Sequence, residues 1–198
     1  MSRTAPQKSP APNRRKTILY ATLAIVIIAI VVGVGLASRN AVPKAASDAP
    51  MDSKLKVGDT APAFTASTNA GQFDLAQVST PVLLEVFATW CPHCQRETTV
   101  LNDLAAKYAG KVAIVAVSGS PYGMDGTSQE SQTDVNRFGA QFQVRYPLAF
   151  DPELKVGRLY LQGGFPTLVL IDKNKKIQWI KSGEISEPDF VKAIQPVI

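Results

Sequence analysis

The chain has 198 residues, 45% of them hydrophobic and 19% charged, a composition that is typical of a globular protein and excludes a wholly disordered or collagen-like chain. Its formal net charge of +5 is concentrated in residues 1–50, which hold seven Lys or Arg and one Asp, whereas residues 51–198 hold 14 basic and 15 acidic residues. The folded part therefore has no basic excess that would bind nucleic acid, and its two cysteines lie too close together to connect distant parts of a fold.

Residues 18–36 form an uncharged apolar stretch that is long enough to cross a membrane. At about 1.5 Å per residue, a helix of this length spans roughly 28 Å, close to the ~30 Å hydrocarbon core of a bilayer. Arg14, Arg15 and Lys16 lie directly before the stretch, so the positive-inside rule predicts a cytoplasmic N-terminus. We therefore expect a single-pass protein of the bacterial cytoplasmic membrane, with residues 37–198 outside the cytoplasm.

The anchor divides the chain into four predicted segments. They are a basic cytoplasmic arm (1–17), the transmembrane anchor (18–36), a flexible linker rich in Ala, Ser and Pro (37–55) and one folded domain (56–198). A cleaved signal peptide is the alternative, because Gly35 and Ala37 have the small-x-small spacing of a cleavage site. The apolar run exceeds the roughly 7–15 residues of a typical signal peptide, which favours a retained anchor.

The first half of the domain alternates apolar segments with turns. We expect a short hairpin over residues 64–74 with Gly71 in its turn, and then a strand over 81–88 that is buried on both faces. A helix over 92–109 and a second buried strand over 112–117 follow. Residues 118–132 are polar and rich in Gly and Ser, which predicts a loop.

The second half is expected to continue with a helix over 133–142, a short strand over 146–150 and a helix that Asp151 caps and that runs to Tyr160. A hairpin and a last helix follow. The hairpin strands are residues 167–171 and 177–181, and Ser186 caps the helix. This order of strands and helices predicts an α/β fold with a mixed sheet flanked by helices.

Both cysteines lie in one motif, Cys91-Pro92-His93-Cys94, between a buried strand and a helix. The Cys91 sulfur is thus expected at a helix N-terminus, where free amides and the helix dipole stabilise a thiolate. Cys94 lies one turn further on and can form a disulfide with it, and Pro92 is tolerated in a first helical turn. A structural zinc site needs four ligands, and the only histidine lies between the cysteines, so zinc is disfavoured.

Two segments carry a resemblance to a known family. The sequence FATWCPHC at residues 87–94 resembles the active-site segment of the thioredoxin superfamily, and GFPT at residues 164–167 resembles its cis-proline loop. The resemblance covers roughly residues 56–198 and implies a thioredoxin fold with a cis Phe165–Pro166 bond beside the cysteines. It also implies that the backbone of Phe165 pairs with an extended substrate peptide.

Further features resemble one branch of that superfamily. The extra helix and strand between residues 117 and 151, the N-terminal hairpin and the membrane anchor are similar to those of TlpA/ResA-like proteins. Members of this branch are extracytoplasmic and usually reductants, and many serve cytochrome c maturation. The resemblance therefore implies thiol–disulfide exchange with protein substrates, most simply as a reductant.

Two acidic residues are candidate catalytic groups beside Cys91 and Cys94. Glu85 lies inside the apolar strand, where the family places a buried acid that relays the proton of Cys94, and burial would raise its pKa. An outward position on an edge strand is the alternative. Glu97 corresponds to an acid that tunes the cysteines of ResA-like proteins; alternatively, it stabilises the helix from a solvated face.

Five residues are expected to shape the client-binding surface: Trp90, Pro92, His93, Phe165 and Pro166. His93 can favour the Cys91 thiolate by a hydrogen bond or by charge, or be an inert surface residue. Pro-His is also the dipeptide of the oxidase DsbA and departs from the Glu-Pro or Gly-Pro of many reductants. A disulfide-forming oxidase is therefore the alternative to a reductant.

The expected activity needs no cofactor beyond the Cys91–Cys94 disulfide, and it needs a membrane redox partner that reduces or oxidises the pair. Two other classes are weaker. A peroxiredoxin carries Thr or Ser three residues before its peroxidatic cysteine and Pro seven before it, where this chain has Ala88 and Leu84. A copper chaperone could bind copper(I) through both thiolates, but the related copper-delivery proteins use a wider cysteine spacing and a distant histidine.

Overall fold

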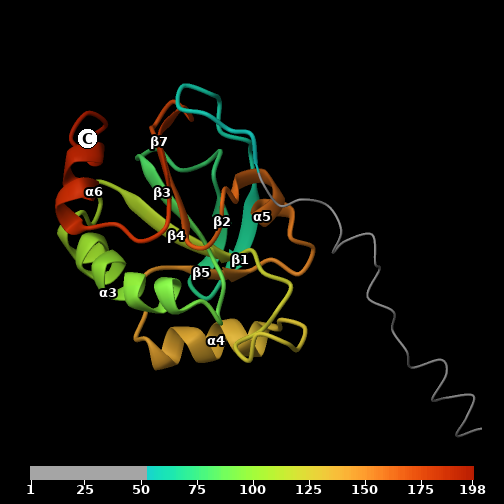
Figure 1. Ribbon diagram of the computed structural model, residues 1–198. Coiled ribbons are helices and arrows are strands. Elements are labelled where there is room, and N and C mark those ends of the chain that lie inside the picture. Colours follow the sequence, from blue (N-terminus) through green and yellow to red (C-terminus); the bar gives the residue numbers. More distant parts are fainter. Residues whose placement is uncertain (1–52) are drawn as a thin grey trace, which may run out of the picture. The chain divides into compact units, whose positions relative to one another are not determined.

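The computed structural model describes residues 53–198 (Figure 1). The predicted anchor, residues 18–36, lies outside the described residues, as does most of the predicted linker. Among residues 53–198, no helix is both long enough and apolar enough to cross a membrane. The described residues fold around one mixed sheet with helices on both of its faces, as the sequence predicted.

Every strand and helix predicted for the domain is present. In chain order they are β1 (Thr65–Thr68), β2 (Gly71–Asp74), β3 (Val82–Phe87), α3 (Pro92–Lys107), β4 (Ala113–Ser118), α4 (Gln132–Gln141), β5 (Leu148–Phe150), α5 (Lys155–Tyr160), β6 (Thr167–Ile171), β7 (Ile177–Ser182) and α6 (Glu187–Ile194). The hairpin formed by β1 and β2 and the extra α4 and β5 are therefore both present in this domain.

The seven strands are arranged in the order β2-β1-β5-β4-β3-β6-β7. Strands β3, β4 and β5 run parallel, and the remaining neighbours pair antiparallel. Strand β3 pairs with β4 on one side and β6 on the other, and all six of its residues are buried. The chain that follows β3, including Cys91, therefore leaves the sheet from its interior and not from an edge.

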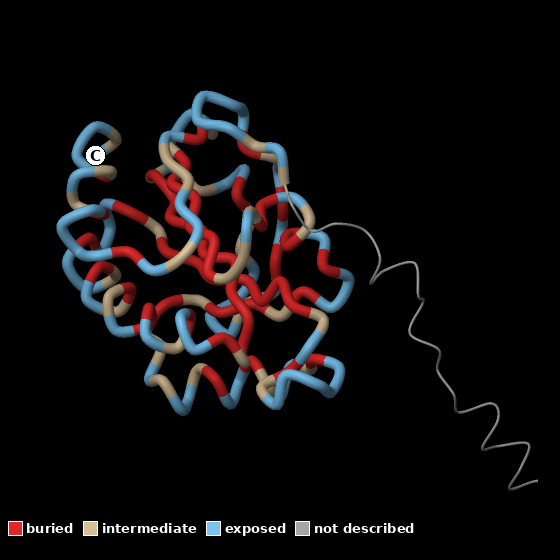
Figure 2. The backbone as a smooth tube through the Cα atoms, viewed as in Figure 1, coloured by how far each residue is buried: buried red, intermediate tan, exposed pale blue. Residues whose placement is uncertain are grey.

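Two hydrophobic clusters cover the two faces of the sheet. Helices α3, α4 and α6 pack on one face through buried side chains such as Leu104, Phe138 and Phe190. Helix α5 and the segment before β1 cover the other face, with Tyr160 and Phe64 in edge-to-face contact. Figure 2 shows that the buried backbone follows the central strands, whereas the outer surfaces of the helices are exposed.

The folded domain begins earlier than the sequence predicted. Ser53 and Leu55, assigned to the linker, are held by hydrogen bonds to the segment after α5: Ser53 N donates to Leu161 O at 2.6 Å, and Gln162 Nε2 donates to Leu55 O at 2.7 Å. Leu55 also packs against the core cluster on that face. Hydrogen bonds to the domain therefore extend three residues ahead of residue 56.

Helix α5 begins later than predicted, because Asp151 is not its N-cap. Leu154 takes that position with a left-handed backbone conformation, φ 54°, and the helix starts at Lys155. The Asp151 carboxylate nevertheless accepts hydrogen bonds from the amides of Lys155, Val156 and Gly157, at 2.7–3.1 Å. Asp151 therefore still binds the first amides of α5, although a tight turn separates it from the start of the helix.

Candidate active site

Cys91 is the N-cap residue of α3, directly after the turn that leaves β3, and Pro92 follows in the first helical turn. The backbone of Cys91 is extended (φ −77°, ψ 118°), and no side-chain hydrogen bond caps the helix at this end. The Cys91 residue is 4% exposed, and its sulfur lies 3.6 Å from the carbonyl oxygen of Phe165. The reactive sulfur is therefore placed at the helix terminus, beside the predicted proline loop.

The two thiols have opposite pKa shifts. The Cys94 thiol donates a hydrogen bond to the Cys91 sulfur, and this contact, helped by the backbone amides of Cys94 and His93, lowers the pKa of Cys91 to about 6 despite burial. Burial first, and then the hydrogen bond with Cys91 and the charge of Glu85, raise the pKa of Cys94. Cys91 is therefore the sulfur that is a thiolate near neutral pH.

Glu85 lies on β3 with its side chain toward the face that carries α3, because side chains alternate along a strand and its neighbours Leu83 and Phe87 belong to that cluster. It is 1% exposed, so the edge-strand alternative is wrong. Its Oε1 has no hydrogen-bond partner, and Tyr146 OH lies 3.5 Å from Oε2. Burial, followed by the charge of Glu97, raises the pKa of Glu85 well above its ordinary value.

Glu97 is fully buried on α3, which excludes a position on a solvated helix face. Its Oε2 accepts a hydrogen bond from the backbone amide of Ile185 at 3.0 Å, and its Oε1 has no partner. Burial is the main reason that the pKa of Glu97 rises to about 7, and the amide of Ile185 opposes the shift. Glu85 and Glu97 are thus two buried carboxyl groups whose charges interact.

The predicted proline loop lies beside the cysteines. The Phe165–Pro166 peptide bond is cis, as the family resemblance implied. The Trp90 ring packs edge-on against the Phe165 ring, with centroids 6.0 Å apart. Trp90 Nε1 donates a hydrogen bond to Ser120 Oγ at 2.8 Å, so the loop after β4 also reaches this side of the site.

His93 lies on the surface and is bound to a residue that sequence reasoning did not identify. Its side chain is 61% exposed, and its Nδ1 lies 2.5 Å from Glu184 Oε1. Arg96 binds the same carboxylate, with Nη2 2.5 Å from Oε1, and this arginine is the main reason that the pKa of Glu184 is lowered. Among the causes of the pKa shift of Cys91, the charge of His93 has the smallest effect.

Sequence reasoning also missed Glu130, a buried acid in the loop between β4 and α4. It accepts hydrogen bonds from the hydroxyls of Thr89 and Ser118, at 2.9 and 2.5 Å. Thr89 belongs to the recognised active-site segment, but the loop that carries Glu130 has no periodic pattern that would have predicted burial. Long-range contacts of this kind become visible only in the folded chain.

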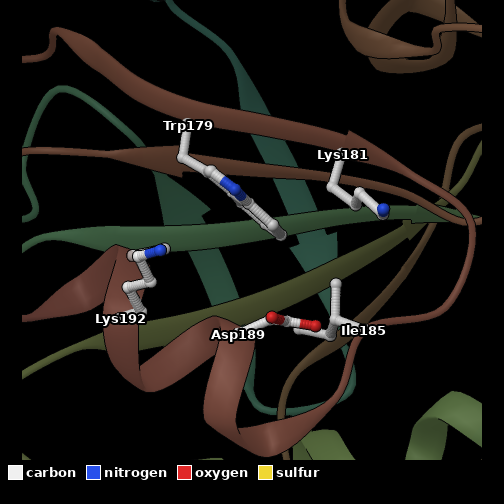
Figure 3. Close-up of a pocket in the computed structure, with 6 residues that line it drawn as sticks. Trp179, Lys181, Ile185, Asp189 and Lys192 are labelled. Atoms are coloured by element: carbon white, nitrogen blue, oxygen red, sulfur yellow. The ribbon is translucent and has the colours of Figure 1, made fainter.

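The structure also contains a groove of about 420 Å³ between β7 and α6 (Figure 3). Trp179 and Lys181 project into it from β7, and Asp189 and Lys192 project from α6. Neither cysteine lines this groove. Across residues 53–198, no three His, Cys, Asp or Glu side chains are grouped in a way that could hold a metal ion.

The chain is similar in sequence to known thiol–disulfide oxidoreductases. The family described as Redoxin matches residues 56–194. Thiol-disulfide oxidoreductase ResA of Oceanobacillus iheyensis is 31% identical over 180 residues, covering 87% of this chain and 81% of the relative. The protein of the same name from Geobacillus thermodenitrificans is 30% identical over 146 residues, covering 72% of this chain and 79% of the relative.

Solved structures show the same fold. A putative thiol:disulfide interchange protein DsbE from Chlorobium tepidum superposes with a TM-score of 0.63 at 29% identity, covering 72% of this chain and 98% of that one. A putative thioredoxin from Neisseria meningitidis has a TM-score of 0.59 at 21% identity and covers 71% of this chain and 90% of that one, a likeness of fold alone. The predicted thioredoxin-like fold is therefore confirmed.

Proposed function

Because the chain belongs to the Redoxin family and is a TlpA/ResA-like thiol–disulfide oxidoreductase of the thioredoxin superfamily, we propose that it reduces disulfides of client proteins outside the cytoplasm. The Cys91–Cys94 pair is its only redox group in this proposal. The observation that carries the proposal is the dithiol at the N-terminus of α3, in which the pKa of Cys91 is lowered, to about 6, and that of its partner Cys94 is raised. A reductant and a strong oxidant differ in how far they stabilise this thiolate.

A thiolate that is strongly stabilised in the reduced protein makes the disulfide oxidising. DsbA, a strong oxidant, has a cysteine pKa near 3.5, whereas the pKa of the thioredoxin cysteine is about 7. The pKa of Cys91, about 6, lies much closer to the thioredoxin value. This closeness supports a reductant.

The proposed reaction begins with the Cys91 thiolate. It attacks one sulfur of a client disulfide, so that a Cys91–client mixed disulfide forms and the other client sulfur leaves as a thiolate. The Cys94 thiol then loses its proton and attacks Cys91 Sγ, which forms the Cys91–Cys94 disulfide and releases the second client thiolate. Two electrons have then passed from the dithiol to the client.

The Cys94 proton needs an acceptor, because the thiol is fully buried and its pKa is raised. Glu85 interacts electrostatically with Cys94, and burial makes its carboxylate more basic than an ordinary one. A carboxylate whose basicity approaches that of its proton donor is suited to general-base catalysis. We assign Glu85 the role of proton acceptor and Glu97 the role of keeping the pKa of Glu85 high.

The site of action follows from the N-terminal sequence. Residues 18–36 would anchor the protein in the cytoplasmic membrane, with the basic residues inside and the domain outside. A membrane protein that donates electrons would then reduce the Cys91–Cys94 disulfide after each cycle. The resemblance to TlpA/ResA-like proteins, many of which serve cytochrome c maturation, supports the same service here, in which a client must present its cysteines as thiols.

A DsbA-like oxidase is the second candidate, and the Pro92-His93 dipeptide is the observation that favours it. In this structure the imidazole is bound to Glu184, which also binds Arg96. The negative charge of Glu184 offsets positive charge near Cys91, so the dipeptide stabilises the thiolate less than it would alone. This pairing supports the reductant over the oxidase.

Equilibration of the full chain with glutathione buffers of known potential tests the direction. We expect a reduction potential close to that of thioredoxin, about −270 mV, and far from that of DsbA, about −120 mV. The reduced protein should also reduce a model protein disulfide, and the Cys91→Ser variant should not. A potential near the DsbA value would instead establish the oxidase.

A further inference from the structure

The loop between β4 and α4, residues 119–131, is fixed to the active-site segment at two points. Thr89 Oγ1 donates to Glu130 Oε1 at 2.9 Å, and Trp90 Nε1 donates to Ser120 Oγ at 2.8 Å. Thr89 and Trp90 are the two residues directly before Cys91. The two ends of the loop therefore hold the backbone and the ring that lead into the reactive cysteine.

Glu130 is the more unusual of the two attachments, because it is a carboxyl group that is only 5% exposed. Both of its oxygens accept hydrogen bonds from fully buried hydroxyls, those of Thr89 and Ser118. Burial raises the pKa of Glu130 to about 7, although these two hydrogen bonds act to lower it. A buried acid costs folding stability, so a fold that needed only packing here would do better with an apolar side chain.

The loop itself is well ordered by its own contacts. Ser120 Oγ binds the backbone amide and the carbonyl oxygen of Tyr122, at 3.0 and 3.1 Å. Tyr122 pairs with Gln129 in an antiparallel bridge, and the amide of Glu130 donates to Pro121 O at 3.0 Å. The two attachment points therefore belong to one cross-linked unit.

The position of the loop start also leaves little freedom. A Cβ atom on Gly119 would lie 2.6 Å from Val86 Cγ1 and 3.1 Å from the Cα of Gly157. The Gly119 amide donates to Phe87 O at 2.9 Å. The loop thus leaves β4 in close contact with both β3 and α5. These contacts fix the position of its first residue, next to Ser120, which binds Trp90.

A continuous set of contacts leads from Glu130 to the reactive sulfur. Glu130 binds Thr89, the next residue is Trp90, and the Trp90 ring packs on Phe165, whose carbonyl oxygen faces Cys91. Through Thr89 and Trp90, the position of Glu130 is therefore coupled to the surroundings of Cys91.

We propose that Glu130 is a positioning residue of the exchange reaction: its carboxylate holds Thr89, and through it the Trp90 ring, where a client segment meets Cys91. The inference rests on the proposed function for its kinetic part, and on the Trp90 environment for a part that is independent of activity. In this proposal, the extra segment between residues 117 and 151 contributes to client reduction through Glu130.

The test uses the full chain with Trp179→Phe as background, so that Trp90 is the only tryptophan. Four variants are compared in it: Glu130→Ala, Glu130→Gln, Thr89→Val and, as a matched control, Ser131→Ala. Ser131 is the next residue and caps α4 through Asp134, so its loss loosens the neighbouring helix without touching the Glu130 contacts. Acrylamide quenching of Trp90 fluorescence and the rate of client disulfide reduction are measured well below each melting temperature.

We expect Glu130→Ala and Thr89→Val to increase the quenching of Trp90 and to slow reduction at least about fivefold, since small misplacements near reacting groups have large kinetic effects. Glu130→Gln should largely keep the quenching of Trp90 and the reduction rate of the background protein, because its amide oxygen can still accept a hydrogen bond from a hydroxyl. Ser131→Ala should lower the melting temperature and leave quenching and rate unchanged.

The proposal is overturned if Glu130→Ala behaves like the background protein in both measurements. If Glu130→Ala does not fold, the same criterion applies to Thr89→Val. It is also overturned if Ser131→Ala produces the same changes, because the effect would then be a general loss of stability. If the background protein itself fails to reduce any disulfide, the proposed function is wrong, while the quenching comparison still decides the role of Glu130.

Discussion

The Cys91 sulfur lies 3.6 Å from the carbonyl oxygen of Phe165, a residue 74 positions further along the chain. The contact joins the helix N-terminus that stabilises the thiolate to the loop that the family resemblance assigns to substrate pairing. A client strand that pairs with the Phe165 backbone would therefore bring its own sulfur next to Cys91. The attacking atom and the client-binding edge are one local arrangement.

Cys91 is expected to be the attacking cysteine. In a Cys94→Ser variant the mixed disulfide cannot be resolved, so covalent complexes with client proteins should accumulate and disappear on reduction. Non-reducing electrophoresis of the full chain from membranes measures them. The Cys91→Ser variant is the matched control and should form few complexes, because Cys94 is fully buried and its pKa is raised. Stable complexes through Cys94 instead would reverse the assignment.

Glu184→Gln is expected to make the protein more oxidising. Without the carboxylate, the charge of Arg96 near Cys91 is no longer offset, which stabilises the thiolate. The pKa of Cys91 should fall and the reduction potential should rise, on the order of 10–20 mV because the ion pair is exposed. Thiolate absorbance against pH and glutathione equilibration measure the two quantities.

Glu187→Gln provides the control for that prediction. It removes another exposed carboxylate from an ion pair, that with Lys107 at 2.6 Å, on a part of α6 that does not contact Cys91. It should leave both quantities unchanged. If Glu184→Gln also changes neither, the Glu184 charge does not act on the thiolate, and the argument against an oxidase loses this support.

The free energy of unfolding is expected to fall as the pH rises from about 4.5 to about 7. Burial raises the pKa of Glu97 from 4.5 in the unfolded chain to about 7, so the folded state binds more protons in this interval. Glu97→Gln should remove its share of the loss, on the order of 3 kcal/mol, because its pKa rises from 4.5 to about 7 and one pKa unit corresponds to about 1.4 kcal/mol. Urea unfolding at pH 4.5 and pH 8 measures the difference.

The same substitution at the exposed Glu187 should leave this pH dependence as it is in the unsubstituted protein. A Glu97→Gln protein that loses as much stability between the two pH values as the unsubstituted one would show that Glu97 titrates normally.

The anchor is expected to remain attached, with the domain outside the cytoplasm. Protease added to spheroplasts should cut within residues 37–52 and release a soluble fragment that contains both cysteines. The cut should fall before Ser53, since the residues from there on are hydrogen-bonded to the domain. A chain that stays intact until the membrane is opened would place the domain on the cytoplasmic side.

Local sequence patterns were sufficient for much of the fold and for the centre of the site. The apolar run of β3, the Cys-x-x-Cys motif at a strand–helix junction and the Gly-Phe-Pro-Thr segment are each contiguous, so neighbouring residues were enough to interpret them. Glu85 was recognised for the same reason, as an acid inside an apolar strand. Burial of Glu97 needed the fold, because α6 and the residues before it cover that face of α3.

Contacts between distant residues account for what was missed. Glu130 meets Thr89 across 41 residues, and Glu184 meets His93 across 91, and both acids lie in irregular segments without periodicity. The start of α5 was misplaced for a different reason. The Asp151-Pro152 pair fits an N-cap directly, but the left-handed Leu154 delays the helix by one tight turn.

Gln162 gives the entry of the chain into the domain a mechanical meaning. Its side chain holds Ser53 and Leu55, the amide of Ser53 binds Leu161, and Phe165 is only three residues beyond Gln162. A force applied to the chain ahead of Ser53 would therefore load the contacts beside the Phe165 loop first, and those at the edge strand β7 only afterwards. Tension on the N-terminal side of the domain would therefore act beside the loop that is proposed to bind clients.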